Sequence, residues 1–227
     1  MSSIQHKFIE FCIESKVLRF GEFKTKAGRL SPYFFNAGLF NTGAMLSKLA
    51  DFYARTLIKA MEEGRIECDM IFGPAYKGIT LAAAVAMRMA ELGYDLPFAY
   101  NRKEVKDHGD TGILLGSKIK DGDKVVIIED VTTSGKSMEE TVPKVRGAAN
   151  VEIVGLMVSL NRMEMGLGGK MSALDEIRET YGFPTNAIVT MEEVVEHLYN
   201  KECQGKIVIN DEIKKAIDAY YEQYGCK

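Results

Sequence analysis

The chain has 227 residues, of which 46% are hydrophobic and 27% charged, a composition that excludes a disordered or fibrous protein. The net charge of −3 lacks the basic excess of a general nucleic-acid binder, but it is compatible with a local basic pocket for an anionic small molecule. The longest apolar run, Leu81–Met87, is too short to span a bilayer, and the first twenty residues lack a signal-peptide core. We therefore expect no membrane association.

The cysteines are scattered, without a CxxC pair and without a histidine at ligand spacing. This argues against a disulfide framework and against a zinc site. We expect reduced, mostly packed thiols, as in a cytoplasmic protein. They are Cys12, Cys68, Cys203 and Cys226.

The first forty residues predict an amphipathic helix over Ile4–Val17 and then, over 20–39, a hairpin or small sheet. From residue 41 onward, apolar strands alternate with helices. The expected strands cover residues 69–72, 97–100, 124–128 and 151–159. The expected helices cover residues 45–61, 79–92, 135–149 and 190–198, the last opened by a capping box. This alternation predicts an α/β fold with a mostly parallel sheet covered on both faces.

Three details complete the expected organisation. An extended loop should follow the strand at 97–100, and Pro143 should kink or restart its helix because proline lacks a backbone donor. A last helix, Asp211–Tyr224, carries an apolar stripe suited to packing. We expect one domain made of an N-terminal helix and addition (1–40), an α/β core (41–199) and a C-terminal helical extension (200–227).

Two adjacent carboxylates, Glu129 and Asp130, follow the apolar strand Lys124–Ile128, at the strand end where ligands of open α/β sheets bind. The next residues are mostly small and rich in hydroxyl groups, and they lead into a helix, so they can cradle a phosphate. They are Val131, Thr132, Thr133, Ser134, Gly135, Lys136 and Ser137. A P-loop is excluded because that motif requires a glycine five positions before Gly135, and this position is occupied by Asp130. Acids beside such a cradle suit a ribose 5-phosphate, since they can accept hydrogen bonds from ribose hydroxyls and stabilise positive charge on the sugar.

This stretch resembles the phosphoribosyl-pyrophosphate-binding motif of the type I phosphoribosyltransferases, in which an apolar strand, two acids and a Thr/Ser/Gly loop follow one another. The alternative is an ordinary strand end followed by a polar turn. The first acid is a glutamate where relatives often have aspartate, which keeps the charge on a longer arm.

Basic residues and three glycines follow the strand at 97–100. The basic residues are Arg102, Lys103, Lys106 and His108. Such a loop suits a lid that closes over a polyanion and excludes water, although the interspersed acids alone would favour a solvated charged loop. The Arg-Lys-x-x-Lys-x-His pattern resembles the catalytic loop of the orotate phosphoribosyltransferases, where the departing group is pyrophosphate.

Residues 24–36 resemble the N-terminal hood of the same enzymes. The resemblance implies that Lys26 reaches the active site and that Phe34 and Phe35 face the flat pyrimidine, for which an aromatic face is a sound partner. Purine phosphoribosyltransferases generally build this hood differently.

Two shorter pieces agree with this resemblance. The loop 73–78 follows a strand and opens a helix, and the resemblance assigns its Tyr76 and Lys77 to the phosphoribosyl donor. Arg162 matches the arginine that holds the orotate carboxylate, which a guanidinium fork fits geometrically. The resemblance also assigns Thr133 to orotate.

The resemblance implies a type I phosphoribosyltransferase fold with a central mostly parallel sheet and a small hood. It implies transfer of ribose 5-phosphate from phosphoribosyl pyrophosphate to orotate, which yields orotidine 5′-phosphate and pyrophosphate in pyrimidine (UMP) synthesis. The implied catalytic residues are Lys26, Lys103, Lys106, His108, Glu129 and Asp130. It further implies Mg²⁺ carried by the pyrophosphate without direct protein ligands, and a cytoplasmic homodimer with shared active sites.

Two alternatives stay open. A purine phosphoribosyltransferase would share the donor motif, but Phe34, Phe35 and Arg162 disfavour it. A non-enzymatic regulator on the same fold could bind RNA or DNA. The basic residues of the lid argue against lost catalysis, and the acidic balance argues against nucleic acid.

Overall fold

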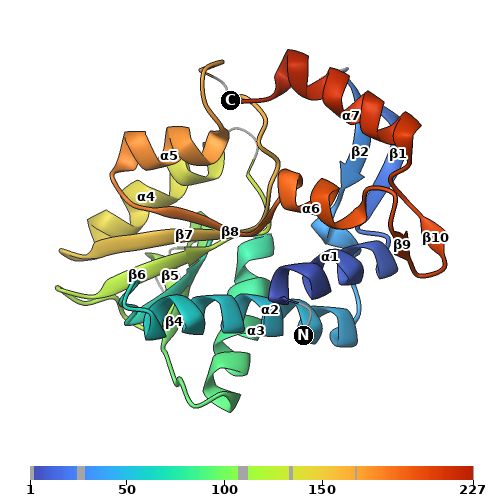
Figure 1. Cartoon of the computed structure of the whole chain (residues 1–227). Helices are drawn as coiled ribbons and strands as arrows, with labels where there is room; N and C mark the ends of the chain where they lie inside the picture. The colour runs from blue at the N-terminus through green and yellow to red at the C-terminus, as the bar shows by residue number, and fades with distance from the viewer. Residues whose placement is uncertain (1–2, 25–28, 107–111, 133–134, 167, 227) are drawn as a thin grey trace.

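A six-stranded sheet forms the centre of the computed structural model (Figure 1), which describes residues 3–24, 29–106, 112–132, 135–166 and 168–226 and, at Val105 and Lys106, the backbone alone. The strands are β3 (Met70–Gly73), β4 (Phe98–Lys106), β5 (Gly112–Gly116), β6 (Lys124–Ile128), β7 (Glu152–Asn161) and β8 (Thr185–Thr190). Their order is β5–β4–β3–β6–β7–β8, and all neighbouring pairs are parallel except β4 with β5. The parallel strands therefore end at one common edge, where β3, β6 and β7 lie side by side.

Helices cover both faces of this sheet (Figure 1). One face packs against α1 (Ile4–Glu14), α2 (Gly43–Glu62), α3 (Lys77–Glu91) and α6 (Met191–Leu198), and the other against α4 (Lys136–Ala148) and α5 (Ala173–Tyr181). Successive strand residues supply the two cores alternately. In β6, Val126 and Ile128 belong to the first core, and Val125 and Ile127 belong to the second. The continuous apolar run of β6 follows from this double burial.

A smaller unit lies beyond α6 (Figure 1). It contains the antiparallel hairpin of β1 (Leu18–Lys24) and β2 (Leu30–Phe35), the short pair β9 (Glu202–Cys203) and β10 (Lys206–Ile207), and α7 (Asp211–Tyr224). Helix α7 packs across β2, where the rings of Tyr33 and Tyr220 meet edge to face at 6.2 Å between centroids. The N-terminal hairpin and the C-terminal helix thus form one cap on the end of the core.

Most expected elements are confirmed, including the opening helix, the hairpin, the capping box at Thr190 and the bounds of the last helix. The prediction of an extended loop after Tyr100 is wrong, because β4 continues to Lys106 and pairs with β5. Helix α4 continues through Pro143 instead of restarting there. The proline leaves only one carbonyl without its helical donor, that of the exposed Glu139, which water can reach.

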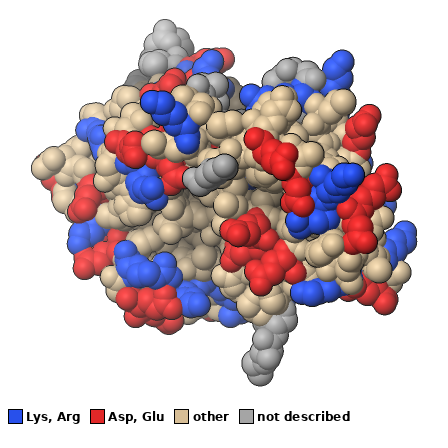
Figure 2. Space-filling model, turned by 45° about the horizontal axis from the view of Figure 1, so that its top comes forward, with Lys and Arg blue, Asp and Glu red and all other residues tan. Residues whose placement is uncertain are grey.

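The surface carries mixed charge. On the face drawn in Figure 2, lysine and arginine side chains alternate with aspartate and glutamate. Within the described ranges, none of the helices has the length and apolar character needed to cross a bilayer. All four cysteines are free thiols, and three of them are buried, as the sequence predicted.

Candidate active site

The acid pair lies directly after β6, and its two carboxylates turn to different partners. Asp130 is buried, and its Oδ2 accepts a hydrogen bond from Lys77 Nζ at 2.8 Å. Glu129 Oε2 accepts one from Ser137 Oγ at 2.6 Å, in the first turn of α4. The pair therefore connects the start of α3 to the start of α4 across the common sheet edge.

Neighbouring elements fix the backbone of these acids. Ser159 of β7 donates to the Asp130 carbonyl twice, from its amide at 2.9 Å and from its hydroxyl at 2.5 Å. The Tyr53 hydroxyl of α2 donates to the Glu129 carbonyl at 2.7 Å. Both donors are buried, so the carbonyl groups are satisfied without water and the carboxylates are held in place.

Burial raises the pKa of Glu129 to about 7. The hydrogen bond from Ser137 and the charge of Lys77 act in the opposite direction, whereas the charge of Asp130 adds to the rise. The two adjacent acids therefore differ in environment, and Glu129 exchanges its proton near neutral pH. A carboxyl group with such a pKa is typical of a functional site.

The loop from the acids to α4 turns at Gly135, whose φ of +68° is a left-handed conformation that glycine adopts without strain. The Gly135 amide donates to Thr132 Oγ1 at 3.1 Å. Helix α4 starts at the exposed Lys136, with no side-chain hydrogen bond from its capping residue. The predicted phosphate ligands Thr133 and Ser134 lie outside the described residues.

The loop between β3 and α3 is so tight that only glycine fits at its ends. A Cβ atom on Gly73 would lie 2.2 Å from the carbonyl oxygen of Gly78. This tightness brings the start of α3 over the acid pair, and it lets Lys77, whose side chain is 63% exposed, reach Asp130. The buried Asn101 of β4 supports the loop by accepting a hydrogen bond from the Ala75 amide at 3.2 Å.

The basic segment on β4 approaches this loop. Lys103 Nζ lies 5.5 Å from the ring centroid of the exposed Tyr76, which is cation–π distance. Arg102 is half-buried one residue earlier. The predicted site residues Tyr76, Lys77 and Lys103 therefore lie close together. The side chain of Lys106 and all of His108 lie outside the described residues.

Arg162 follows β7, next to the acid pair at the same sheet edge. Its Nη2 and Nε donate to Glu164 Oε1 at 2.7 and 3.1 Å, and Nε also donates to the Tyr33 hydroxyl at 3.3 Å. The Arg162 side chain is only 19% exposed. The predicted carboxylate ligand is thus already paired on one edge of its guanidinium group.

The two predicted aromatic residues of the hood lie on opposite sides of β2. The Phe34 ring stacks on Phe23 at 5.5 Å between centroids and is partly exposed, and Phe35 packs against the main core. Because neighbouring strand residues face opposite ways, at most one of these rings can face a planar ligand. Lys26 lies outside the described residues.

The sequence analysis missed the groups that support these side chains, namely Tyr53, Asn101, Ser159, Glu164 and also Tyr221 of α7, whose hydroxyl donates to the Arg162 carbonyl at 2.5 Å. Only Glu164 had a local signal, because an acid two residues from a predicted anion-binding arginine is an evident partner. The others come from distant elements and act on backbone groups, so no motif marks them.

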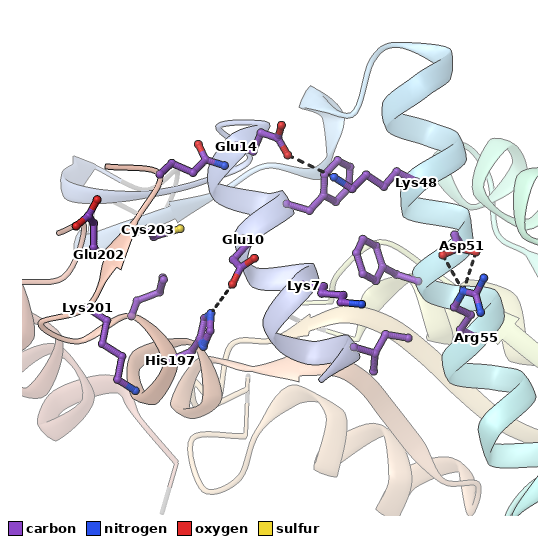
Figure 3. Close-up of a pocket in the computed structure, with 15 residues that line it drawn as sticks. Lys7, Glu10, Glu14, Lys48, Asp51, Arg55, His197, Lys201, Glu202 and Cys203 are labelled. Atoms are coloured by element: carbon purple, nitrogen blue, oxygen red, sulfur yellow. Dashed lines mark hydrogen bonds and ion pairs between the residues drawn. The ribbon is translucent and has the colours of Figure 1, made fainter. Parts of the chain in front are cut away.

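A cavity of about 930 Å³ lies elsewhere, between α1, α2 and the segment from α6 to β9 (Figure 3). Many of its charged side chains pair with each other, for example His197 with Glu10 at 3.2 Å and Lys48 with Glu14 at 3.3 Å. Of the predicted site residues that the structure describes, none lines it.

The fold and the acid-pair loop define a phosphoribosyltransferase, and the family model of the phosphoribosyl transferase domain matches residues 44–179. The orotate phosphoribosyltransferase of Agathobacter rectalis is 61% identical over 100% of both chains, and that of Lachnoclostridium phytofermentans is 57% identical over 99% of both. The crystal structure of orotate phosphoribosyltransferase from Francisella tularensis matches with a TM-score of 0.82 and 37% identity, over 96% of this chain and 99% of that one. The chain belongs to the orotate phosphoribosyltransferase family, as the motifs predicted.

Proposed function

We propose that this chain transfers ribose 5-phosphate from phosphoribosyl pyrophosphate to orotate, releasing pyrophosphate and forming orotidine 5′-phosphate in pyrimidine (UMP) synthesis. The observation that carries the proposal is the juxtaposition, at one sheet edge, of the acid pair Glu129–Asp130 and the arginine Arg162. The first suits the sugar of the donor and the second suits the carboxylate of the acceptor. The names of the relatives also favour orotate over a purine base, which has no carboxylate.

In this mechanism the anomeric carbon loses pyrophosphate through an oxocarbenium-like state, and the ring nitrogen of orotate attacks from the opposite face. Glu129 and Asp130 accept hydrogen bonds from the ribose hydroxyls and stabilise the developing positive charge. The loop from Val131 to Ser137 holds the 5-phosphate at the start of α4. The amides that no capping side chain covers support this role.

Basic side chains neutralise the departing pyrophosphate. They are Lys26, Lys77, Arg102, Lys103, Lys106 and His108. Lys77 has a second role before the donor arrives, since it neutralises Asp130 at 2.8 Å. Its ammonium group must turn from this carboxylate toward the pyrophosphate as the donor binds, and its 63% exposure supports such freedom.

Orotate lies between the hood and the end of β7. Arg162 binds its carboxylate, Thr133 contributes a polar contact, and one ring of the pair Phe34 and Phe35 covers the planar base. Among the described residues the guanidinium group bonds the uncharged Tyr33 hydroxyl and the charged Glu164 through Nε and Nη2, which leaves Nη1 for this second carboxylate.

Magnesium is the cofactor of this proposal. In this proposal the ion is carried by the pyrophosphate, with phosphate oxygens and waters as its ligands, and the carboxylates of Glu129 and Asp130, paired with Ser137 and Lys77, are not needed as direct ligands. The bound ion would neutralise the pyrophosphate leaving group. Among the described side chains, no group of three or more His, Cys, Asp and Glu converges as a dedicated metal site.

We also propose a homodimer in which lid residues of one subunit reach the site of its partner. The exposed Tyr76 and Met87 of the α3 region, 62% and 69% accessible, support a contact on this side. A mixture of inactive Arg102→Ala and Asp130→Asn proteins should regain about a quarter of the wild-type activity, because half of the dimers are then mixed and each has one intact site. No recovery after subunit exchange, or an active monomer in sedimentation, would contradict shared sites.

The cytoplasm is the proposed location. Four free thiols support it, because secreted proteins usually pair their cysteines.

The activity is tested with protein, Mg²⁺, phosphoribosyl pyrophosphate and orotate, by the loss of near-ultraviolet absorbance of orotate. We expect a loss that requires both the donor and Mg²⁺. A folded protein that leaves orotate unchanged would overturn the proposal, and purine bases would then be tested in its place.

A further inference from the structure

The loop after β7 is held by two separate parts of the chain. Its Arg162 and Glu164 meet Tyr33 from the hood strand β2 and Tyr221 from α7. Tyr33 is 1% exposed, and its ring lies 5.2 Å from the Arg162 guanidinium carbon. The surroundings of Arg162 are therefore built by segments far apart in the sequence.

The hydrogen bonds of this cluster have a defined direction. Tyr33 donates its single hydroxyl proton to Glu164 Oε1 at 2.5 Å, and Tyr221 donates its own to the Arg162 carbonyl at 2.5 Å. The two hydroxyl oxygens lie 3.3 Å apart, but both protons are already used. Glu164 Oε1 thus accepts hydrogen bonds from the Tyr33 hydroxyl and from two guanidinium nitrogens, while the Tyr221 hydroxyl binds the backbone carbonyl of Arg162.

The end of α7 adds a backbone clamp on the same loop. The Met165 amide donates to the Tyr224 carbonyl at 2.8 Å, and the Cys226 amide donates to the Met163 carbonyl at 3.0 Å. Glu164 and Gly225 form an antiparallel bridge between them. The segment from Tyr224 to Cys226 therefore pairs with the three residues that follow Arg162.

This arrangement divides the donors of the guanidinium group. The edge formed by Nε and Nη2 faces Glu164 and Tyr33. Nη1, by contrast, makes no hydrogen bond to any part of the chain that the structure describes. A planar guanidinium held on one edge has no freedom to rotate its other edge, so that edge is fixed in direction.

We infer that Glu164, Tyr33 and Tyr221 are positioning residues for the acceptor, and that α7 serves to aim the Nη1 edge of Arg162 at the carboxylate of the base. This rests on the proposed function and gives the C-terminal extension a role in acceptor specificity. Among the described residues, the Tyr221 hydroxyl bonds Tyr33 and the Arg162 carbonyl and makes no hydrogen bond to Glu129 or Asp130, so its loss should affect orotate more than the donor.

Tyr221→Phe tests the inference, because it removes one hydroxyl and keeps the buried ring. Steady-state assays should show the KM for orotate raised about fivefold to tenfold, the KM for phosphoribosyl pyrophosphate unchanged and kcat within twofold. Tyr33→Phe should show the same split. Tyr94→Phe is the matched control, since the exposed Tyr94 hydroxyl bonds Glu62 at 3.0 Å far from this loop, and both KM values should stay at the wild-type level.

Thermal unfolding of each variant separates positioning from simple stabilisation. A lower Tm with both KM values unchanged, or with both raised together, would overturn the inference and leave Tyr221 a purely structural residue. A wild-type protein that does not use orotate would overturn the proposed function, and the inference with it. If the wild-type protein is active and the Tyr221→Phe and Tyr33→Phe variants have the same KM for orotate as the wild type, the inference is overturned and the proposed function stands.

Discussion

The ends of β6 and β7 each carry an ion pair, and the two pairs are built differently. At β6, Lys77 reaches Asp130 with a side chain that is 63% exposed. At β7, Arg162 and Glu164 are 19% and 13% exposed, and two tyrosine hydroxyls complete the cluster. The first pair has one partner that is free to leave, and the second is enclosed on several sides.

Under the proposed function, this difference corresponds to the two substrates. The donor brings a highly charged pyrophosphate that must be bound and then released, so a lysine able to change partners suits its end of the sheet. The acceptor brings one carboxylate on a rigid ring, which needs a fixed direction more than mobility. Adjacent strands of one sheet thus present an adaptable site and a rigid one.

The sharpest test of this comparison is stability. Glu164→Ala should lower the free energy of unfolding by about 3 kcal/mol, because it leaves the enclosed guanidinium and the Tyr33 hydroxyl without their acceptor. Lys77→Ala should lower it by at most about 1 kcal/mol, because an exposed ammonium contributes little. Urea unfolding at constant m-value measures both. Equal losses of unfolding free energy in the two variants would mean that the ends of β6 and β7 do not differ in rigidity.

Asp130→Asn should have the largest effect on the reaction itself. Losing this charge should lower kcat about 10²- to 10³-fold, because the carboxylate then no longer stabilises the sugar as pyrophosphate leaves. Asp218→Asn, on the exposed side of α7, is the control for the same chemical change and should retain wild-type kcat. The orotate absorbance assay measures both, with circular dichroism to verify folding. A turnover of Asp130→Asn within threefold of wild type would remove this residue from the mechanism.

Glu129 should give the site its pH dependence. Its pKa of about 7 lies above the ordinary value of 4.5, mainly through burial, so the ionised form that accepts from ribose hydroxyls is lost as the pH falls through 7. Between pH 7 and 6, this group should lower kcat/KM for the donor about fivefold, because its ionised fraction falls from about one half to about one tenth, and Glu129→Gln should remove that part of the slope. Glu152→Gln, at the opposite end of β7, should keep the wild-type profile. An unchanged slope in Glu129→Gln would assign the titration to another group.

Much of the adaptable end could be predicted from the sequence, because local patterns encode it. The apolar run of β6, the two acids after it and the glycine turn into α4 are contiguous, and each has a physical reason that a single segment shows. The same holds for the loop before α3, although the helix starts at Lys77 and not at Ile79.

The rigid end could be predicted only in part. Arg162 was found by resemblance, but no motif marks Tyr33, and Tyr221 lies in the last helix, for which the sequence predicted only an apolar stripe suited to packing. Their contacts join residues 131 and 188 positions apart, and single-segment patterns carry no such information. The strand extension of β4 was missed for another reason: its charged residues, Arg102 and Lys103, conceal a β-strand that pairs at the sheet edge.

The clamp between the end of α7 and the loop after β7 also orders events during synthesis. The ribosome makes the hood strand β2 early and α7 last among these elements. The Tyr33 hydroxyl therefore lacks the neighbouring hydroxyl of Tyr221 until α7 has been made. All residues of the sheet and of its acid pair precede α7 in the chain, whereas the rigid end needs the hydroxyl of Tyr221 from α7. The end of β6 is therefore built from residues that are all made before α7 supplies the last contacts at the end of β7.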